Sequence, residues 1–318
     1  MYDVAALGEL LVDFTDAGIS QNGMHLFEQN PGGAPANVLT GLSRMHFQTA
    51  FIGKVGSDLN GRFLESVLKR EHVDTSGLIV DPNYFTTLSF VSLSKDGQRS
   101  FSFARKPGAD TMLRREEVKD DILRNTKIFH IGSLSLTNEP SRTATLSALE
   151  TAKKAGCIIS YDPNYRASLW PSEEKAKEEI RSVLPYIDVI KLSEEETDFV
   201  TPEKDPEAAG KFLIDHGVKA AFITLGKNGA YVFNREGCVF APPVPGHAID
   251  TNGAGDCFCS GILSRICESS KPLDALSLKE LSQYAHFANA AASCCIEKHG
   301  AIPSMPTLEE INQRLSAV

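Results

Sequence analysis

The chain of 318 residues is 42% hydrophobic and 23% charged, which is the composition of an ordinary globular protein. Its 41 acidic residues outnumber its 32 basic residues, and the net charge of -9 disfavours binding to nucleic acid or to an anionic membrane surface. Seven cysteines without regular spacing predict reduced, buried thiols of a cytoplasmic protein, and no stretch reaches the ~18 apolar residues of a membrane helix.

The N-terminal part of the chain alternates short apolar runs with helical patterns. The opening run VAALGELLVDF predicts a buried strand that ends in a turn, and its acidic residues and missing basic segment are unlike a signal peptide. Helical spacing at Val38, Leu42 and Met45 predicts a helix after PGGAPAN. The run AFIGKVGSD predicts a second strand, which leads into the helix candidate NGRFLESVLKREH.

Residues 86–104, TTLSFVSLSKDGQRSFSFA, follow a different pattern. Polar and apolar residues alternate on both sides of a turn at Lys95-Asp96-Gly97-Gln98. Alternation of polar and apolar residues, which leaves one face exposed to solvent, predicts a β-hairpin. We expect this hairpin to form an antiparallel flap outside the main sheet.

The remaining strands and helices alternate regularly. Apolar runs in KIFHIGSLSL, CIISYDPN, DVIKLSEEE and AAFITLGKNGAYVF are each followed by a turn or a helical pattern. This order is typical of repeated βαβ units, so we expect an α/β fold with a mostly parallel sheet and helices on both faces. No linker divides the chain, and residues 1–318 predict one domain with a small β flap.

Polar residues concentrate where the predicted strands end. Ligands of open α/β sheets bind at the carboxyl ends of the strands, so these positions predict one site. The residues are Asp13, Gly32, Gly33, Asn37, Asp162, Asn164, Arg166, Glu194 to Glu196, Gly226, Gly229 and Asp250 to Asp256.

Each of these motifs also has a purely structural interpretation. The glycines of GGAPAN let the backbone approach a ligand, and Asn37 can donate and accept, but a tight turn before a helix explains the same residues. Asp162, Asn164 and Arg166 can hold polyol hydroxyls or phosphate, or they form a solvated loop with an internal ion pair. The spacing Gly226-x-x-Gly229 needs no more than a hairpin turn.

The stretch NGAGD combines a glycine-rich turn, a helix start and a carboxylate. Backbone N–H groups at a helix N-terminus bind anions, and Asp256 beside them is placed to take a proton from an attacking hydroxyl. A glycine turn with an aspartate near a helix start is the structural alternative. The chain contains neither GxGxxG nor GxxxxGK[ST], which argues against a dinucleotide fold and a P-loop.

Taken together, these motifs resemble those of the ribokinase-like (PfkB) carbohydrate kinases, and most closely the fructokinases. The similar stretches are GELLVDF, GGAPAN, GKVGSDLNG, SFSFARKPGAD, YDPNYRASLWPS, IKLSEEE, TLGKNGAYVF, DTNGAGDCFCSG and HGAIPSMPT, and they span almost the whole chain. The resemblance implies a three-layer α/β/α sandwich with a β lid built from about residues 12–30 and 85–106. It also implies transfer of the γ-phosphoryl group of ATP to a sugar hydroxyl, with O-6 of D-fructose as the expected acceptor.

The resemblance assigns a role to each site residue. Asp256 would be the general base, and the amides of Gly253, Ala254 and Gly255 the anion hole. The sugar contacts would be Asp13, Gly32, Gly33, Asn37, Arg105, Asp162, Asn164 and Arg166. The ATP contacts would be Lys191, Ser193, Thr224, Gly226, Gly229 and Asn289. Glu196 would contact Mg²⁺ through water, and K⁺ would bind at Asp250, Asn252, Cys295, Lys298, Gly300 and Ser304. The lid would cover the sugar and mediate a homodimer.

Two positions depart from the family pattern. Asn252 stands where the family usually has Thr, and Ser193-Glu194-Glu195-Glu196 replaces Asn-x-x-Glu. The first change affects the expected cation preference, and the second affects a nucleotide or Mg²⁺ contact. Two alternatives remain open. The first is another sugar kinase of the family, such as a 2-keto-3-deoxygluconate kinase, because Arg105 and Arg166 can bind a carboxylate. The second is a non-catalytic sugar- or nucleotide-sensing relative, which would keep the same fold.

Overall fold

A computed structural model describes residues 1–93 and 99–317, and these residues are built around a nine-stranded, mostly parallel sheet. The strands lie in the order β13-β12-β11-β10-β9-β8-β1-β4-β5, and all neighbours are parallel except the two pairs that involve β12. Their bounds are β1 Tyr2–Leu7, β4 Thr49–Gly56, β5 Asp74–Asp81, β8 Thr126–Ile131, β9 Ile158–Tyr161, β10 Val189–Ser193, β11 Ala220–Thr224, β12 Ala230–Asn234 and β13 Gly237–Ala241. The predicted α/β fold is confirmed.

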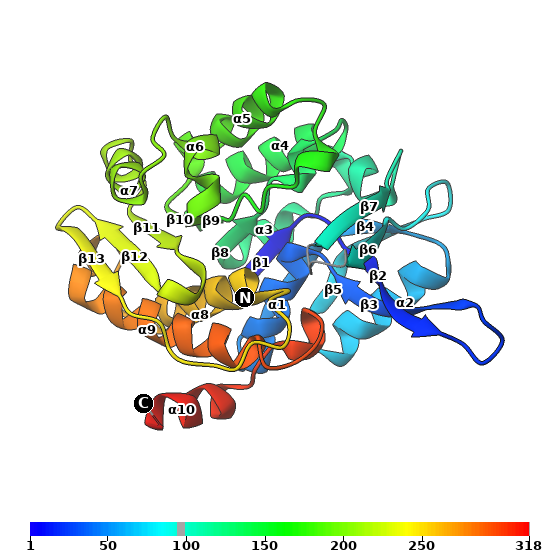
Figure 1. Ribbon diagram of the computed structural model, residues 1–318. Coiled ribbons are helices and arrows are strands. Elements are labelled where there is room, and N and C mark those ends of the chain that lie inside the picture. The colour runs from blue at the N-terminus through cyan, green and yellow to red at the C-terminus, as the bar shows by residue number, and fades with distance from the viewer. Residues whose placement is uncertain (94–98, 318) are drawn as a thin grey trace.

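Helices cover both faces of this sheet, which explains why its strands are apolar on both sides (Figure 1). The helices are α1 Ala34–Arg44, α2 Leu59–Arg70, α3 Asp120–Arg124, α4 Ser141–Lys154, α5 Glu173–Ser182, α6 Thr197–Val200, α7 Pro206–Asp215, α8 Ala254–Glu268, α9 Leu278–Cys295 and α10 Leu308–Ser316. One core cluster joins the sheet to α1, α2, α8 and α9, and the other joins it to α3, α4, α5 and α7. The sheet is therefore the middle layer of an α/β/α sandwich.

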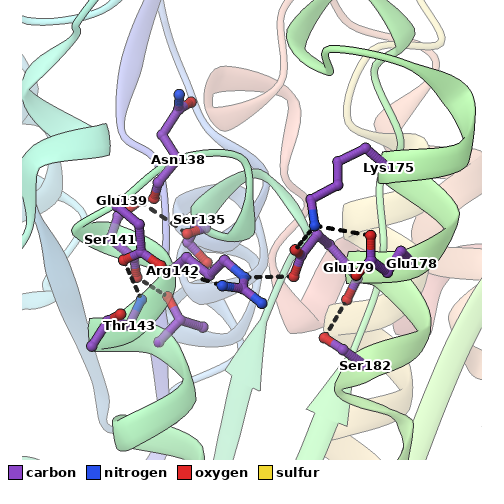
Figure 2. Close-up of polar contacts among 11 residues, drawn as sticks. Ser135, Asn138, Glu139, Ser141, Arg142, Thr143, Lys175, Glu178, Glu179 and Ser182 are labelled. Carbon is purple, nitrogen blue, oxygen red and sulfur yellow. Dashed lines mark hydrogen bonds and ion pairs between the residues drawn. The ribbon is translucent and has the colours of Figure 1, made fainter.

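A polar network ties α4 to α5 on one of these faces (Figure 2). Glu179 of α5 is 2% exposed, and its carboxylate binds Arg142 Nε at 2.5 Å and Lys175 Nζ at 2.7 Å. Arg142 also reaches Glu139 Oε1 at 3.3 Å. The Glu179 carboxylate is buried, whereas Arg142 and Lys175 are partly exposed. Their pairing compensates a buried negative charge that would otherwise destabilise the fold.

A separate four-stranded sheet lies beside the sandwich, in the order β3-β2-β6-β7. Its strands are β2 Leu11–Ile19, β3 His25–Gly32, β6 Leu88–Leu93 and β7 Arg99–Ala104. β6 and β7 are antiparallel, as the alternating pattern predicts, while the predicted turn at Lys95 to Gln98 lies outside the described residues. The sheet and its β2–β3 turn expose large apolar side chains, namely Ile19, Phe27 and Phe90 in the strands and Met24 in the turn.

Two expectations about individual positions are wrong. Asp13 lies within β2 of the small sheet and does not follow a strand of the main sheet, because the chain leaves the main sheet after Leu7. Cys238 is exposed, although Cys157, Cys257, Cys259, Cys294 and Cys295 are buried as expected. Among the described residues, no helix is long and apolar enough to cross a membrane.

Candidate active site

Asp256 occupies the first turn of α8 and is buried, with 7% of its surface exposed. Asn37 Nδ2 of α1 donates to Asp256 Oδ2 at 2.7 Å, and Asn164 Nδ2 donates to Oδ1 at 3.2 Å. Asn164 follows β9 and has a φ of 48°, a left-handed conformation that turns the loop toward α8. Two amides from distant segments thus fix the orientation of the carboxylate.

The surroundings of Asp256 shift its proton equilibrium toward neutral pH. Burial, the largest cause, and the nearby Asp162 carboxylate raise the pKa of Asp256 to about 7, against the opposing effects of Asn37, Lys191 and Arg166. A carboxylate with a pKa near the working pH is suited to accept a proton during catalysis.

The N-terminus of α8 supplies the predicted anion site. Gly253, with a φ of 77°, begins the helix, and no side chain caps it. Uncapped amides at a helix start carry partial positive charge and bind phosphate. The Ala254 N–H already donates to the Thr251 carbonyl at 3.3 Å, so the Gly255 amide is the better placed of the predicted donors.

Lys191 brings a buried positive charge to the same place. Its Nζ lies 3.1 Å from Asp162 Oδ2 and only 2.9 Å from the position that a Cβ at residue 255 would occupy, so a side chain there would displace it. Although burial favours the neutral amine, the carboxylates of Asp162, Glu196 and Asp256 raise the pKa of Lys191. The ammonium therefore stays charged beside the helix N-terminus.

A cavity of about 270 Å³ opens in front of Asp256. The predicted sugar contacts that line it are Asp13, Gly33, Asn37, Asn164 and Arg166. Burial raises the pKa of Asp13, whose Oδ2 lies 2.5 Å from the place of a Cβ at Gly32, so Gly32 leaves room for this carboxylate without lining the cavity itself. The size and polar lining suit a monosaccharide.

Arg105 and Asp162 lie outside the lining of this cavity. Arg105 is 7% exposed and pairs with Asp110, with Nε 2.8 Å from Oδ2, and its Nη2 donates to the Leu134 carbonyl at 2.9 Å. Thr87 hydrogen-bonds the other oxygen of Asp110 at 2.5 Å. Thr87 immediately precedes β6 and Arg105 immediately follows β7. Asp110 therefore binds the chain on both sides of the β6–β7 hairpin.

A second cavity, of about 480 Å³, lies on the other side of the α8 N-terminus. The predicted ATP contacts Thr224, Gly226, Gly229 and Asn289 line it, together with the apolar side chains of Val244, Phe258 and Ile296. Lys191 lines the first cavity instead, which we call the sugar cavity after the predicted contacts that line it. Thr251 and Gly255 line both cavities, so the two spaces meet at the predicted anion site.

Glu196 and Ser193 form a compact hydrogen-bonded unit after β10. Glu196 Oε2 accepts from the Ser193 N–H at 2.9 Å and from its hydroxyl at 3.1 Å, while Oε1 accepts from the Tyr165 N–H at 2.7 Å. The carboxylate therefore links this strand end to the loop that carries Asn164 and Arg166.

The residues predicted to hold a monovalent cation lie together at the edge of the site. Asp250 accepts from the Asn252 N–H at 2.8 Å and from the Gly300 N–H at 3.1 Å, and Ser304 Oγ lies 3.0 Å from Cys295 Sγ. The Lys298 side chain turns away and binds Glu310 at 2.6 Å. The predicted ligands are one carboxylate, one hydroxyl and backbone carbonyls, which are oxygen donors of the kind that K⁺ binds.

The cavities also contain residues that the sequence did not single out. Glu9 and Leu134 line the sugar cavity, and Lys227 and Pro243 to Gly246 line the second one. Glu9 stands as an acid inside the apolar run VAALGELLVDF, which was a usable signal, whereas nothing in the sequence distinguishes Leu134 from a core residue.

The chain is similar to known carbohydrate kinases over almost its whole length. The model of the pfkB family carbohydrate kinases matches residues 1–308. Probable fructokinase-7 of Arabidopsis thaliana is 41% identical over 99% of this chain and 92% of its own length. The crystal structure of fructokinase with bound ATP from Xylella fastidiosa superposes with a TM-score of 0.92 at 29% identity, covering 100% of this chain and 99% of that one. A fructokinase double mutant from Vibrio cholerae O395, with bound fructose, ADP and potassium ion, gives 0.89 at 30% identity and covers 99% and 98% of the two chains.

The ribokinase-like fold and the site at the α8 N-terminus define a carbohydrate kinase. The chain belongs to the pfkB family of carbohydrate kinases.

Proposed function

We propose that this enzyme is a fructokinase, which transfers the γ-phosphoryl group of ATP to O-6 of D-fructose. The observation that carries the proposal is the position of Asp256, a buried base of raised pKa that lines the first cavity next to Gly255, where the two cavities meet. The similarity to fructokinases over the full chain supports the choice of sugar.

Asp256 would take the proton of the sugar hydroxyl as its oxygen attacks phosphorus. The new O–P bond forms while the bond from the γ-phosphorus to the β,γ-bridging oxygen breaks, and that oxygen leaves with ADP. Asn37 and Asn164 hold the carboxylate in the orientation needed for the proton transfer. The Gly255 amide and the Lys191 ammonium would balance the charge that spreads over the phosphoryl oxygens.

The metal assignments remain part of the proposal. Mg²⁺ prefers octahedral oxygen ligands and usually keeps several waters, so it would be held mainly by the phosphates, with Glu196 reaching it through water. K⁺ would bind near Asp250, the carbonyls of Asn252, Cys295, Lys298 and Gly300, and the Ser304 hydroxyl, where its charge would add to that of the α8 N-terminus. Asn252 would bind K⁺ through its backbone carbonyl, so it would act as the Thr that the family usually has at this position.

We also propose that the small sheet acts as a lid. It places Asp13 and Phe103 in the sugar cavity, and closing it would exclude water from the phosphoryl group. Its exposed Ile19, Met24, Phe27 and Phe90 support a homodimer through this sheet. A cytoplasmic location stays a prediction.

One observation favours a second substrate class. Arg166 lines the sugar cavity, so it can pair with a carboxylate, as a 2-keto-3-deoxygluconate kinase requires. Arg105, the other arginine considered for this role, is committed to Asp110. A non-catalytic sensing protein fits less well, because a binding protein does not need a base with a pKa near 7 at its anion site.

The test is a panel of hexoses and keto acids with ATP and Mg²⁺, each with and without K⁺. We expect fructose to give the highest kcat/KM. Preference for the acid would favour the second class, and no turnover of any compound would exclude the kinase assignment.

A further inference from the structure

Glu9 is a buried carboxylate with no role in the function proposed so far. It lies between β1 and β2, at the point where the chain passes from the main sheet to the small sheet, and is 3% exposed. It lines the sugar cavity together with Asp13, Gly33 and Asn37. An acid in such a position needs hydrogen-bond donors, because a buried carboxylate without them is costly.

One oxygen of Glu9 has a structural partner. Oε1 accepts from the Ala34 N–H at 2.8 Å, which is the first amide of α1. The Glu9 carbonyl oxygen lies 2.3 Å from the place of a Cβ at Gly33, whose φ is 120°, so only glycine fits there. Glu9 thus shapes the turn that carries Gly33, and one helical turn later α1 presents Asn37 to Asp256.

The second carboxylate oxygen of Glu9, Oε2, has no such partner in the described part of the chain. Glu9 Oε2 is buried, and the described residues provide it with no hydrogen-bond partner. Burial raises the pKa of Glu9 to about 7, against the opposing effects of the Glu9 and Ala34 N–H groups and of Arg105, while Asp110 adds to the rise. A second donor is what this carboxylate lacks, and a sugar in the cavity would present hydroxyl groups to the same wall.

We infer that Glu9 is a sugar-binding residue, whose Oε2 accepts a hydrogen bond from a non-reacting hydroxyl of the substrate while Oε1 holds the start of α1. The inference rests on the proposed function, since it needs a polyol in this cavity. It assigns to Glu9 the selection of a sugar by one hydroxyl, separate from the proton transfer at Asp256.

The Glu9→Gln variant tests this assignment. Gln keeps the size of the side chain and an oxygen for the Ala34 N–H, but replaces the second acceptor with an NH₂ donor. We expect the KM for fructose to rise about tenfold or more, the scale of losing a hydrogen bond to a charged group, with kcat and the KM for ATP changed by less than about threefold.

A matched control separates this effect from the loss of a helix cap. Asp205 caps α7 away from both cavities, with its Oδ2 2.9 Å from the Ala208 N–H, so Asp205→Asn makes the same chemical change at another helix start. This control should leave the KM for fructose unchanged. Thermal unfolding of both variants confirms that each is folded under the assay conditions.

Sugar analogues identify the hydroxyl. The analogues are fructose without the hydroxyl at C1, C3 or C4. The analogue that lacks the hydroxyl bound by Glu9 should have a higher KM than fructose with the wild-type enzyme. The Glu9→Gln substitution should not raise the KM for that analogue further. A wild type that phosphorylates fructose with the same KM as Glu9→Gln supports the proposed function and overturns this inference. A penalty of equal size for every analogue also overturns it, and a wild type without turnover overturns both proposals.

Discussion

Asn37 and Asp256 lie 219 positions apart in the chain, and Asn37 Nδ2 donates to Asp256 Oδ2 at 2.7 Å. The bond joins the start of α1 to the start of α8, two helices that pack in the same layer. Each helix follows a glycine with positive φ, Gly33 or Gly253. The two motifs at these helix starts, GGAPAN and NGAGD, are therefore two halves of one site.

Replacing Asp256 with Asn should abolish most of the turnover without preventing sugar binding. The amide keeps the size of the side chain but cannot take a proton, so we expect kcat to fall at least ~10²-fold, the usual scale for losing a general base. Steady-state kinetics give kcat, and calorimetry gives the affinity for fructose. A nearly normal kcat would remove Asp256 from this role.

The pH dependence of kcat should report the Asp256 proton. With a pKa of about 7, the carboxyl is protonated and inactive at lower pH, so kcat should rise as the pH increases through about 7. Asn37→Ala removes a donor that lowers this pKa, and the rise should move to higher pH. The profile is measured at saturating fructose, because Glu9 titrates in the same range and affects binding. An unchanged midpoint in Asn37→Ala would contradict the role of this hydrogen bond.

Removing K⁺ should lower kcat severalfold, because the ion would add positive charge next to the α8 N-terminus. We expect Asp250→Ala to lose the response to K⁺, since Asp250 holds the Asn252 and Gly300 segments together. Asn252→Thr is the matched variant and should keep the response, because it leaves the backbone carbonyl in place. Activity is compared in K⁺, Na⁺ and tetramethylammonium salts at equal ionic strength. Equal activity in all three salts would exclude the site.

Replacing Glu179 with Ala should destabilise the fold but leave the active site intact. The substitution leaves Arg142 and Lys175 without their shared acceptor (Figure 2), and both side chains are partly exposed, so we expect a loss of about 1–3 kcal/mol in the free energy of unfolding. Glu178→Ala, on the same helix and exposed, should change the free energy of unfolding much less. Urea unfolding compares the two, and similar losses would show that the buried pair contributes little.

The sequence predicts the fold well because local patterns determine it. Apolar runs without alternation belong to strands that are covered on both faces, such as β4, whereas the alternating run at 86–104 becomes the hairpin of the small sheet. The location of NGAGD at a helix start also follows from the local sequence, since a glycine turn leads into an apolar run that begins with an acid.

The residues that the sequence places less well are those whose partners come from other segments. Arg105 is a plausible sugar contact until Asp110 is seen to pair with it, together with Thr87 from a third position. Glu9 looks like part of a strand, and only the approach of α1 makes it a cavity residue. Such contacts depend on how the loops fold over the sheet edge, which no periodicity encodes.

Thr251 and Gly255, the residues that line both cavities, also constrain the design of inhibitors. A compound that links a sugar to a nucleoside would run past these two residues and close to Lys191, whose Nζ lies 2.9 Å from the position of a Cβ at residue 255. We therefore expect a slender, anionic linker to bind best. An aromatic or branched connection would crowd Lys191 beside Asp162, whereas a phosphonate bridge carries the negative charge that the Lys191 ammonium attracts.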